Sequence, residues 1–262
     1  MDIIEALILG VIQGLTEFLP VSSSGHIELG AVLLDVQSKD NLLFSIIVHG
    51  ATALSTIVVF RKTIIQIIIE LFEFKWNEST QFLTKIIISM IPVGIAGVFF
   101  EKQIESFFGG NVTFVASMLL ITGVLLSFTY FAQNPKKEVS YWKAFFIGLA
   151  QAVAILPGIS RSGATISTAI LLGVDKEKAT KFSFLMVLPP ILGAMLLKIK
   201  QIIEQPELAN HVDVSVLSVG FLAAFISGII ACAWMVNIVK RGKLIYFAIY
   251  CILIGLTVII FS

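Results

Sequence analysis

Two short polar breaks interrupt an otherwise apolar sequence and carry most of its chemically versatile side chains. The first, PVSSSGH, spans residues 20–26 and contains three serines and His26. Gln13 and Glu17 precede it, one helical turn apart, and would share a helix face. His26 can act as nucleophile, base or acid, while Glu17 with Gln13 and the oxygens of a bound diphosphate can hold hydrated Mg²⁺. This break therefore predicts acid–base and metal chemistry on a phosphorylated substrate.

The second break, PGISRSG at residues 157–163, adds a fixed positive charge at Arg161. In both breaks the serines, Ser22–Ser24 and Ser160–Ser162, are good N-cap residues for the segment that follows. A helix N-terminus presents free N–H groups and the positive end of the helix dipole to an anion. The planar guanidinium of Arg161 suits phosphate oxygens. Two such turns facing each other would form a strongly polar pocket of phosphate size.

Each of these residues also has a structural interpretation. Serines in membrane helices more often pack or cap than catalyse, and His26 can simply hydrogen-bond a neighbour. Intramembrane Glu and Arg are costly and mark functional sites by default; their structural alternative is a Glu17–Arg161 ion pair between the two halves. His49 lies within an apolar stretch, where a cavity position and a core position are equally compatible with the sequence.

The composition places these breaks in a membrane protein. The chain has 262 residues, of which 57% are hydrophobic and 13% charged, about half the charge of an ordinary soluble domain. A bilayer core needs about 20 apolar residues per helix, and flanking lysines extend the shorter stretches. Six stretches lack acidic and basic residues and are predicted to span: 42–60, 86–100, 112–132, 182–197, 214–239 and 244–261. The net charge of +1 gives no case for nucleic acid binding.

The sequence also repeats itself at an offset of 138 residues. GVIQGLTEFLPVSSSGH at 10–26 falls on GLAQAVAILPGISRSGA at 148–164, and the first three spans fall on the last three. Each unit is then an interrupted apolar segment followed by three spans, so the second unit enters the membrane from the opposite side. We expect a single membrane domain over 1–262, with repeat 1 at about 1–132 and repeat 2 at about 139–262. Its predicted fold is all-α and polytopic, an inverted-topology repeat of six transmembrane helices plus two re-entrant helix hairpins.

The basic residues predict which side faces the cytoplasm. With both hairpins excluded from the crossings, fourteen of the 18 Lys and Arg residues fall on one side and four on the other. The positive-inside rule makes the first side cytoplasmic, so the PVSSSGH hairpin enters from outside. The segment 63–74, with Gln66, Glu70 and Glu73 on one stripe, is predicted to lie along the cytoplasmic interface.

QGLTEFLPVSSSGH together with PGISRSGAT resembles the two signature motifs of the undecaprenyl-diphosphate phosphatases of the bacitracin-resistance type. The resemblance covers the whole chain. It implies re-entrant helices, an active site open to the extracytoplasmic face, and removal of the terminal phosphate of undecaprenyl diphosphate to recycle the lipid carrier for cell-wall synthesis. It also implies a divalent cation, Mg²⁺ or Ca²⁺, and a place in the bacterial inner membrane, and it leaves a homodimer open.

By residue matches, the resemblance assigns catalysis to Glu17, Ser23, His26 and Arg161. We favour Ser23 as the nucleophile and His26 as its base, although the motif does not decide which of the two attacks phosphorus. Gln13 stands where many members have glutamate, which leaves Glu17 as the main metal ligand, with Gln13 beside it. The residues expected to bind substrate are Ser22, Ser24, Gly158, Ser160, Ser162 and Thr165.

A transporter is the alternative from another class. Inverted repeats with helices broken at mid-depth are the usual architecture of secondary transporters. A flippase for a lipid phosphate, or an anion carrier, would use Arg161 and the helix N-termini equally well. It would not obviously need Glu17 and His26 beside the serines.

Overall fold

The computed structural model describes residues 1–33, 41–100, 103, 107, 111–132, 137–204 and 213–261, and these residues are almost entirely helical. The first half contains α1 (Ile3–Phe18), α2 (Ser23–Leu33), α3 (Asn41–Val59), α4 (Arg61–Leu71), α5 (Glu78–Phe99) and α7 (Val112–Phe128). The second half contains α8 (Tyr141–Val153), α9 (Arg161–Leu171), α10 (Lys176–Met186), α11 (Leu188–Glu204), α12 (Val214–Lys240) and α13 (Ile245–Phe261). The all-α, polytopic prediction is confirmed.

Every predicted span coincides with helical structure. α5, α12 and the segment Lys176–Glu204, which is interrupted at Val187, are long and apolar enough to cross a membrane. The bent pair of α3 and α4 makes a fourth candidate, while α7 and α13 are shorter apolar helices of 17 residues. Large apolar side chains cover the outer surface, as in Leu196 and Leu253, which are 67% and 59% exposed. Such a surface suits lipid rather than water.

The segment predicted to lie along the interface forms α4. It meets α3 at an angle of 76° and has no buried residue. A helix that turns away from the span before it and has no fully buried residue agrees with the predicted position at the membrane surface.

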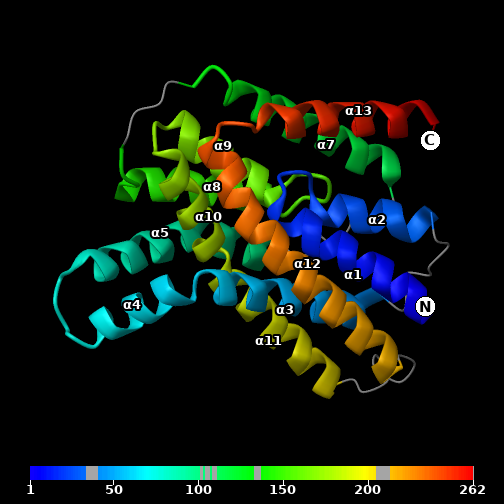
Figure 1. Ribbon diagram of the computed structural model, residues 1–262, viewed down its shortest axis with the longest axis horizontal. Helices are drawn as coiled ribbons and strands as arrows, with labels where there is room; N and C mark the ends of the chain where they lie inside the picture. The colour runs from blue at the N-terminus through cyan, green and yellow to red at the C-terminus, as the bar shows by residue number, and fades with distance from the viewer. Residues whose placement is uncertain are drawn as a thin grey trace.

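The two interrupted segments form matching helical hairpins. α1 and α2 are joined through the first polar break, and α8 and α9 through the second (Figure 1). The helix starts at Ser23 and Arg161 are separated by the same 138 residues that relate the repeats. The breaks are thus real interruptions at equivalent places, while the opposite membrane orientation of the two units stays a prediction.

Close packing of small residues fixes α1 against α12. A Cβ atom on Gly10 would lie 2.6 Å from the Gly220 carbonyl oxygen, and one on Gly14 would lie 2.0 Å from Ser227 Oγ. Small residues allow membrane helices to approach closely and gain dispersion contacts. Because Glu17 lies less than one turn beyond Gly14, this contact also sets the position of the carboxylate.

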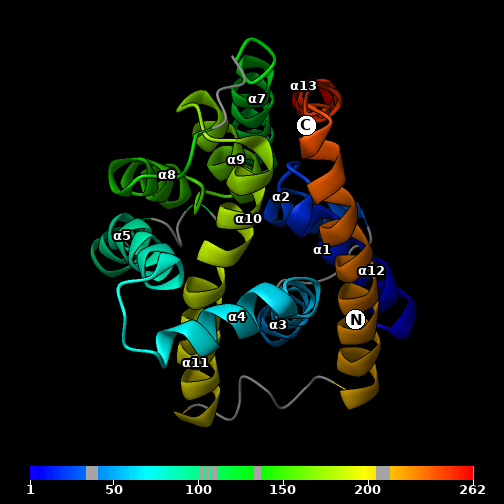
Figure 2. The same ribbon diagram turned by 60° about the vertical axis from the view of Figure 1, so that its left-hand side comes forward.

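The other end of the bundle is built on α7 and α13. These two helices lie side by side along one edge of the molecule (Figures 1 and 2). A Cβ atom on Gly123 would lie 2.7 Å from Ile252 Cγ1, and one on Gly255 would lie 2.8 Å from Leu120 Cδ2. This pair supports both polar turns.

Candidate active site

The first turn places Ser22 directly before α2. Ser22 has a positive φ of 71°, and its Oγ accepts a hydrogen bond from the Gly25 N–H at 3.2 Å. Its carbonyl accepts from the His26 N–H at 3.1 Å. The predicted capping role of this serine is therefore confirmed, and the first turn of α2 contains Ser23 and Ser24.

The second turn repeats this geometry with different side chains. Ser160 is the N-cap of α9, and its Oγ accepts from the Gly163 N–H at 3.0 Å. Gly158 has φ +92°, and a Cβ atom there would lie 2.3 Å from the Val115 carbonyl oxygen, so only glycine fits. Arg161 stands in the second turn at the position equivalent to Ser23. The two turns are otherwise similar, but the first supplies a hydroxyl group at this position and the second supplies a positive charge.

The two turns touch. Ser162 Oγ donates to the Leu19 carbonyl oxygen at 3.2 Å, and a Cβ atom on Gly25 would lie 3.4 Å from Gly158 Cα. α7 holds the second turn in place through Thr122, whose Oγ1 accepts from the Ser160 N–H at 3.0 Å. The predicted pocket depends on this contact, which the sequence alone does not establish.

Glu17 is the centre of the site. Its Oε1 forms an ion pair with Arg161 Nη2, and its Oε2 accepts from Gln13 Nε2 at 3.0 Å and from Ser23 Oγ at 2.8 Å. The Glu17 side chain is 5% exposed and that of Arg161 19%. Because α1 ends at Phe18 and α9 begins at Arg161, the carboxylate and the guanidinium meet where both helices are interrupted. The sequence offered two interpretations of Glu17 and Arg161, a functional site or a structural ion pair. In the structure the ion pair is present, and it lies in the same cluster as Ser23 and Gln13.

His26 lies next to this cluster but is bound elsewhere. Its Nδ1 lies 2.8 Å from the Ser22 carbonyl oxygen and its Nε2 lies 2.7 Å from the hydroxyl of Tyr250 on α13. The expected Ser23–His26 pair is replaced by a Ser23–Glu17 hydrogen bond, because the six-residue separation across the turn returns Ser23 to the end of α1. Tyr250 was missed from the sequence, where an aromatic residue in an apolar span resembles a lipid contact.

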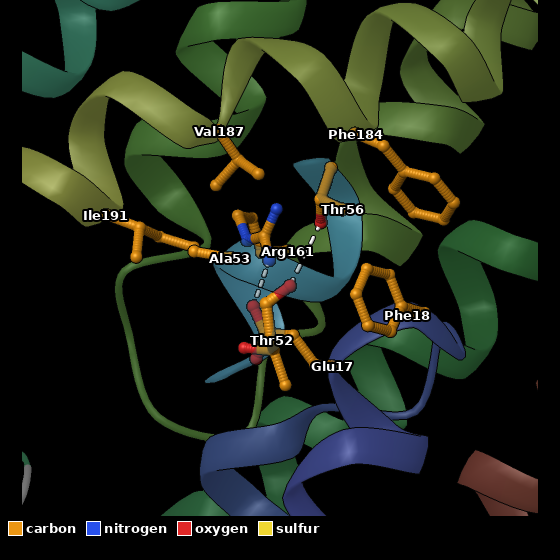
Figure 3. A pocket seen from close by; sticks show the side chains of 9 residues that line it. All are labelled: Glu17, Phe18, Thr52, Ala53, Thr56, Arg161, Phe184, Val187 and Ile191. Carbon is orange, nitrogen blue, oxygen red and sulfur yellow. Dashed lines mark hydrogen bonds and ion pairs between the residues drawn. The ribbon is translucent and has the colours of Figure 1, made fainter. Parts of the chain in front are cut away.

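A small cavity adjoins Glu17 and Arg161 (Figure 3). Its volume is about 10 Å³, room for about one water molecule, so the predicted pocket of phosphate size is not open in this structure. Figure 3 shows the ion pair between α1 and α9 beside the α3 residues Thr52 and Thr56. The rest of the wall is apolar: Phe18, Ala53, Phe184, Val187 and Ile191. Thr52 and Thr56 are four residues apart on an apolar helix, and this spacing carries no chemical signal in the sequence.

The remaining predicted residues lie close by in different roles. Ser24 Oγ is 3.4 Å from Ser22 Oγ, within the first turn. Thr165 is fully buried one turn into α9, and its hydroxyl donates to the Arg161 carbonyl oxygen at 2.9 Å. His49 Nδ1 lies 2.8 Å from the Ser45 carbonyl oxygen on α3. Thr165 thus supports the helix that carries Arg161.

The donor set at Glu17 suits a hard cation only in part. Gln13 is fully buried, and its Oε1 has no hydrogen-bond partner in the described part of the chain. An amide oxygen and a carboxylate are ligands that Mg²⁺ and Ca²⁺ accept. Among the described residues there is no group of three or more His, Cys, Asp or Glu side chains that could hold a metal. The residues therefore fit a divalent cation that takes its other ligands from water and from phosphate oxygens.

Comparison with known proteins connects this site to one family. The model of the family described as bacitracin resistance protein BacA matches residues 6–257. A protein of Christiangramia forsetii named undecaprenyl-diphosphatase is 56% identical over 100% of this chain and 99% of its own length. Proteins of the same name from Bacteroides fragilis and Salinibacter ruber are 53% and 41% identical, covering 100% and 96% of this chain and 99% and 96% of their own.

Proposed function

This chain belongs to the bacitracin resistance protein BacA family, and we propose that it is an integral membrane phosphatase that hydrolyses undecaprenyl diphosphate to undecaprenyl phosphate and inorganic phosphate. Relatives that carry the name undecaprenyl-diphosphatase support the enzyme over the transporter alternative. The observation that carries the chemistry is the buried contact of one carboxylate, Glu17, with both a hydroxyl and a guanidinium.

Ser23 is the nucleophile in this proposal. Its Oγ already donates to Glu17 Oε2, so the carboxylate is placed to take the hydroxyl proton as the oxygen attacks the terminal phosphorus. The new Oγ–P bond forms as the bond from phosphorus to the bridging oxygen breaks, and undecaprenyl phosphate leaves. This assigns to Glu17 the base role that the sequence analysis gave to His26.

Arg161 has to change partner for this to happen. Paired with Arg161, Glu17 is a weak base, and the ion pair fills the space that a phosphate needs. A phosphate entering the site competes for the guanidinium and offers it two oxygens in bidentate geometry. The exchange would free Glu17 for the Ser23 proton and place the cation on the phosphoryl oxygens, where charge stabilisation is most effective.

The Ser22 and Ser160 caps occupy the N–H groups of Gly25 and Gly163, so the earlier N–H groups of α2 and α9 would be the ones to face these oxygens. A divalent cation, Mg²⁺ or Ca²⁺, would be held by Glu17 and, after its amide turns to bring Oε1 toward Glu17, by Gln13; it would supply further neutralisation of the diphosphate charge when bound, while Glu17 keeps one oxygen for Ser23. His26 belongs to the second half of the reaction in this proposal: it accepts a proton from the water that attacks phosphorus, the Oγ–P bond breaks, Glu17 returns its proton to Ser23 Oγ, and phosphate is released.

The membrane setting follows from the charge distribution and the apolar surface. We place the protein in the bacterial inner membrane, with the site reached from the extracytoplasmic side and the lipid tail lying among the spans. Once the site has opened to admit the diphosphate, the apolar wall formed by Phe18, Phe184, Val187 and Ile191 would face the first carbons of the prenyl chain. The sequence leaves a homodimer open, and the described residues give no argument for one.

The test is phosphate release from a short-chain polyprenyl diphosphate by the purified protein in detergent, first with Mg²⁺ and then with EDTA. Phosphate release that depends on Mg²⁺ supports both the proposed activity and the role of the metal. Release that persists in EDTA shows that the reaction does not need the metal. Absence of release by folded protein, with uptake of lipid phosphate or phosphate into reconstituted vesicles, would support the transporter instead.

A further inference from the structure

Tyr250 connects the last helix to the first polar turn. Its hydroxyl lies 2.7 Å from His26 Nε2, across 224 residues of sequence, and the two rings stack with centroids 5.6 Å apart and an interplanar angle of 16°. Tyr250 lies on an apolar span and is 40% exposed, yet its hydroxyl contacts His26, which has a role in the proposed reaction. This hydrogen bond indicates that Tyr250 does more than pack against its neighbours.

The two partners of His26 define its hydrogen-bonding state. The Ser22 carbonyl can only accept, so Nδ1 carries the proton in that 2.8 Å contact. In the neutral ring Nε2 is then the acceptor, and the Tyr250 hydroxyl donates to it. When His26 is protonated the direction reverses and the same hydroxyl accepts, so Tyr250 can hold the ring in both states.

The position of Tyr250 is itself fixed. The adjacent Cys251 is fully buried, and its Sγ lies 3.6 Å from the Pro20 carbonyl oxygen in the first turn. Close contacts at Gly123 and Gly255 lock α13 onto α7, which holds the second turn through Thr122. A tyrosine carried by this helix pair is therefore held rigidly relative to both turns.

We propose that Tyr250 is a positioning residue of the active site: its hydroxyl holds the His26 imidazole in the Nδ1–H tautomer, turns away from Nε2 when that nitrogen takes the proton of the attacking water, and then accepts from the protonated ring. A base oriented by a third group is the general arrangement for activating a nucleophile. The inference rests on the proposed function, because it requires that His26 takes part in the reaction.

The first measurement compares Tyr250→Phe with the wild type in phosphate release from a short-chain polyprenyl diphosphate with Mg²⁺. Loss of one neutral hydrogen bond to the base should lower kcat about five- to tenfold and leave KM within about twofold. Tyr246→Phe is the matched control, the same change one turn earlier on α13 at a side chain that is 64% exposed, and it should retain wild-type kcat. Unchanged kcat in Tyr250→Phe overturns the inference.

The second measurement asks whether Tyr250 acts through His26. In a His26→Asn background, Tyr250→Phe should lower the residual kcat by less than about twofold, because the group that it positions is gone. The same fold loss in both backgrounds would show a structural effect of Tyr250 and would overturn the inference.

The failure of each proposal has its own signature. No phosphate release by the wild type overturns the proposed function. Full activity of His26→Asn overturns the role of His26 and, with it, that of Tyr250.

Discussion

The ion pair between Glu17 and Arg161 should contribute to stability and to activity in ways that mutation can separate. Arg161→Met removes the cation but leaves a carboxylate whose side chain is 5% exposed. Removing one partner of a buried pair costs about 3–5 kcal/mol. Because Gln13 and Ser23 still donate to Oε2, we expect the lower end, about 3 kcal/mol. At about 2–4 °C per kcal/mol for a chain of this size, Tm should fall by roughly 6–12 °C.

The assay is thermal unfolding in detergent, combined with phosphate release, for Arg161→Met and for the double variant Glu17→Gln/Arg161→Met. Neutralising the carboxylate as well removes the unpaired charge, so the double variant should recover most of the lost Tm. Its phosphate release should remain about 10²-fold or more below wild type, since both electrostatic groups are absent. An unchanged Tm in the single variant, or restored activity in the double variant, would refute this reasoning.

Three further changes test the parts that position the site. Gln13→Glu should lower the Mg²⁺ concentration for half-maximal activity roughly several-fold, because a second carboxylate joins Glu17. A Mg²⁺ titration of EDTA-treated protein measures this concentration, and an unchanged value would show that Gln13 is not a metal ligand. Gly14→Ala should lower both Tm and activity because its Cβ would lie 2.0 Å from Ser227 Oγ, whereas Gly94→Ala, with nothing within 4 Å, should do neither; equal Tm values would contradict the packing argument. Gly158→Ala should inactivate the enzyme by displacing the turn from Val115, and wild-type phosphate release by this variant would show that the left-handed turn is dispensable.

The sequence predicted those parts of the fold that depend on hydropathy and on broken periodicity. Long apolar stretches become helices because a bilayer leaves the backbone few other ways to satisfy its polar groups. The two breaks can be recognised because Pro20 and Pro157 lack a backbone N–H donor, and because runs of serine are out of place in an apolar helix. The predicted capping by Ser22 and Ser160 follows from local chemistry alone, and the structure confirms it.

Long-range partners were beyond the reach of the sequence. Glu17 was identified from its cost in a membrane, but its hydrogen bond with Ser23 depends on how sharply the turn reverses the chain. The hydroxyl of Tyr250 meets His26 only because α13 packs on α7 and passes the first turn. Nor does spacing reveal that Thr52 and Thr56 line the cavity, since threonine is common in membrane helices and gives no distinctive signal.

The most direct test of the account is release of the terminal phosphate from an isotopically labelled polyprenyl diphosphate by three proteins: wild type, Ser23→Ala and Ser218→Ala. Ser218 on α12 donates to the Val214 carbonyl oxygen on its own helix and serves as the matched control. We expect labelled phosphate from the wild type and from Ser218→Ala, and release reduced to background in Ser23→Ala. Near-normal release by Ser23→Ala would contradict the assignment of Ser23 as the nucleophile held by Glu17.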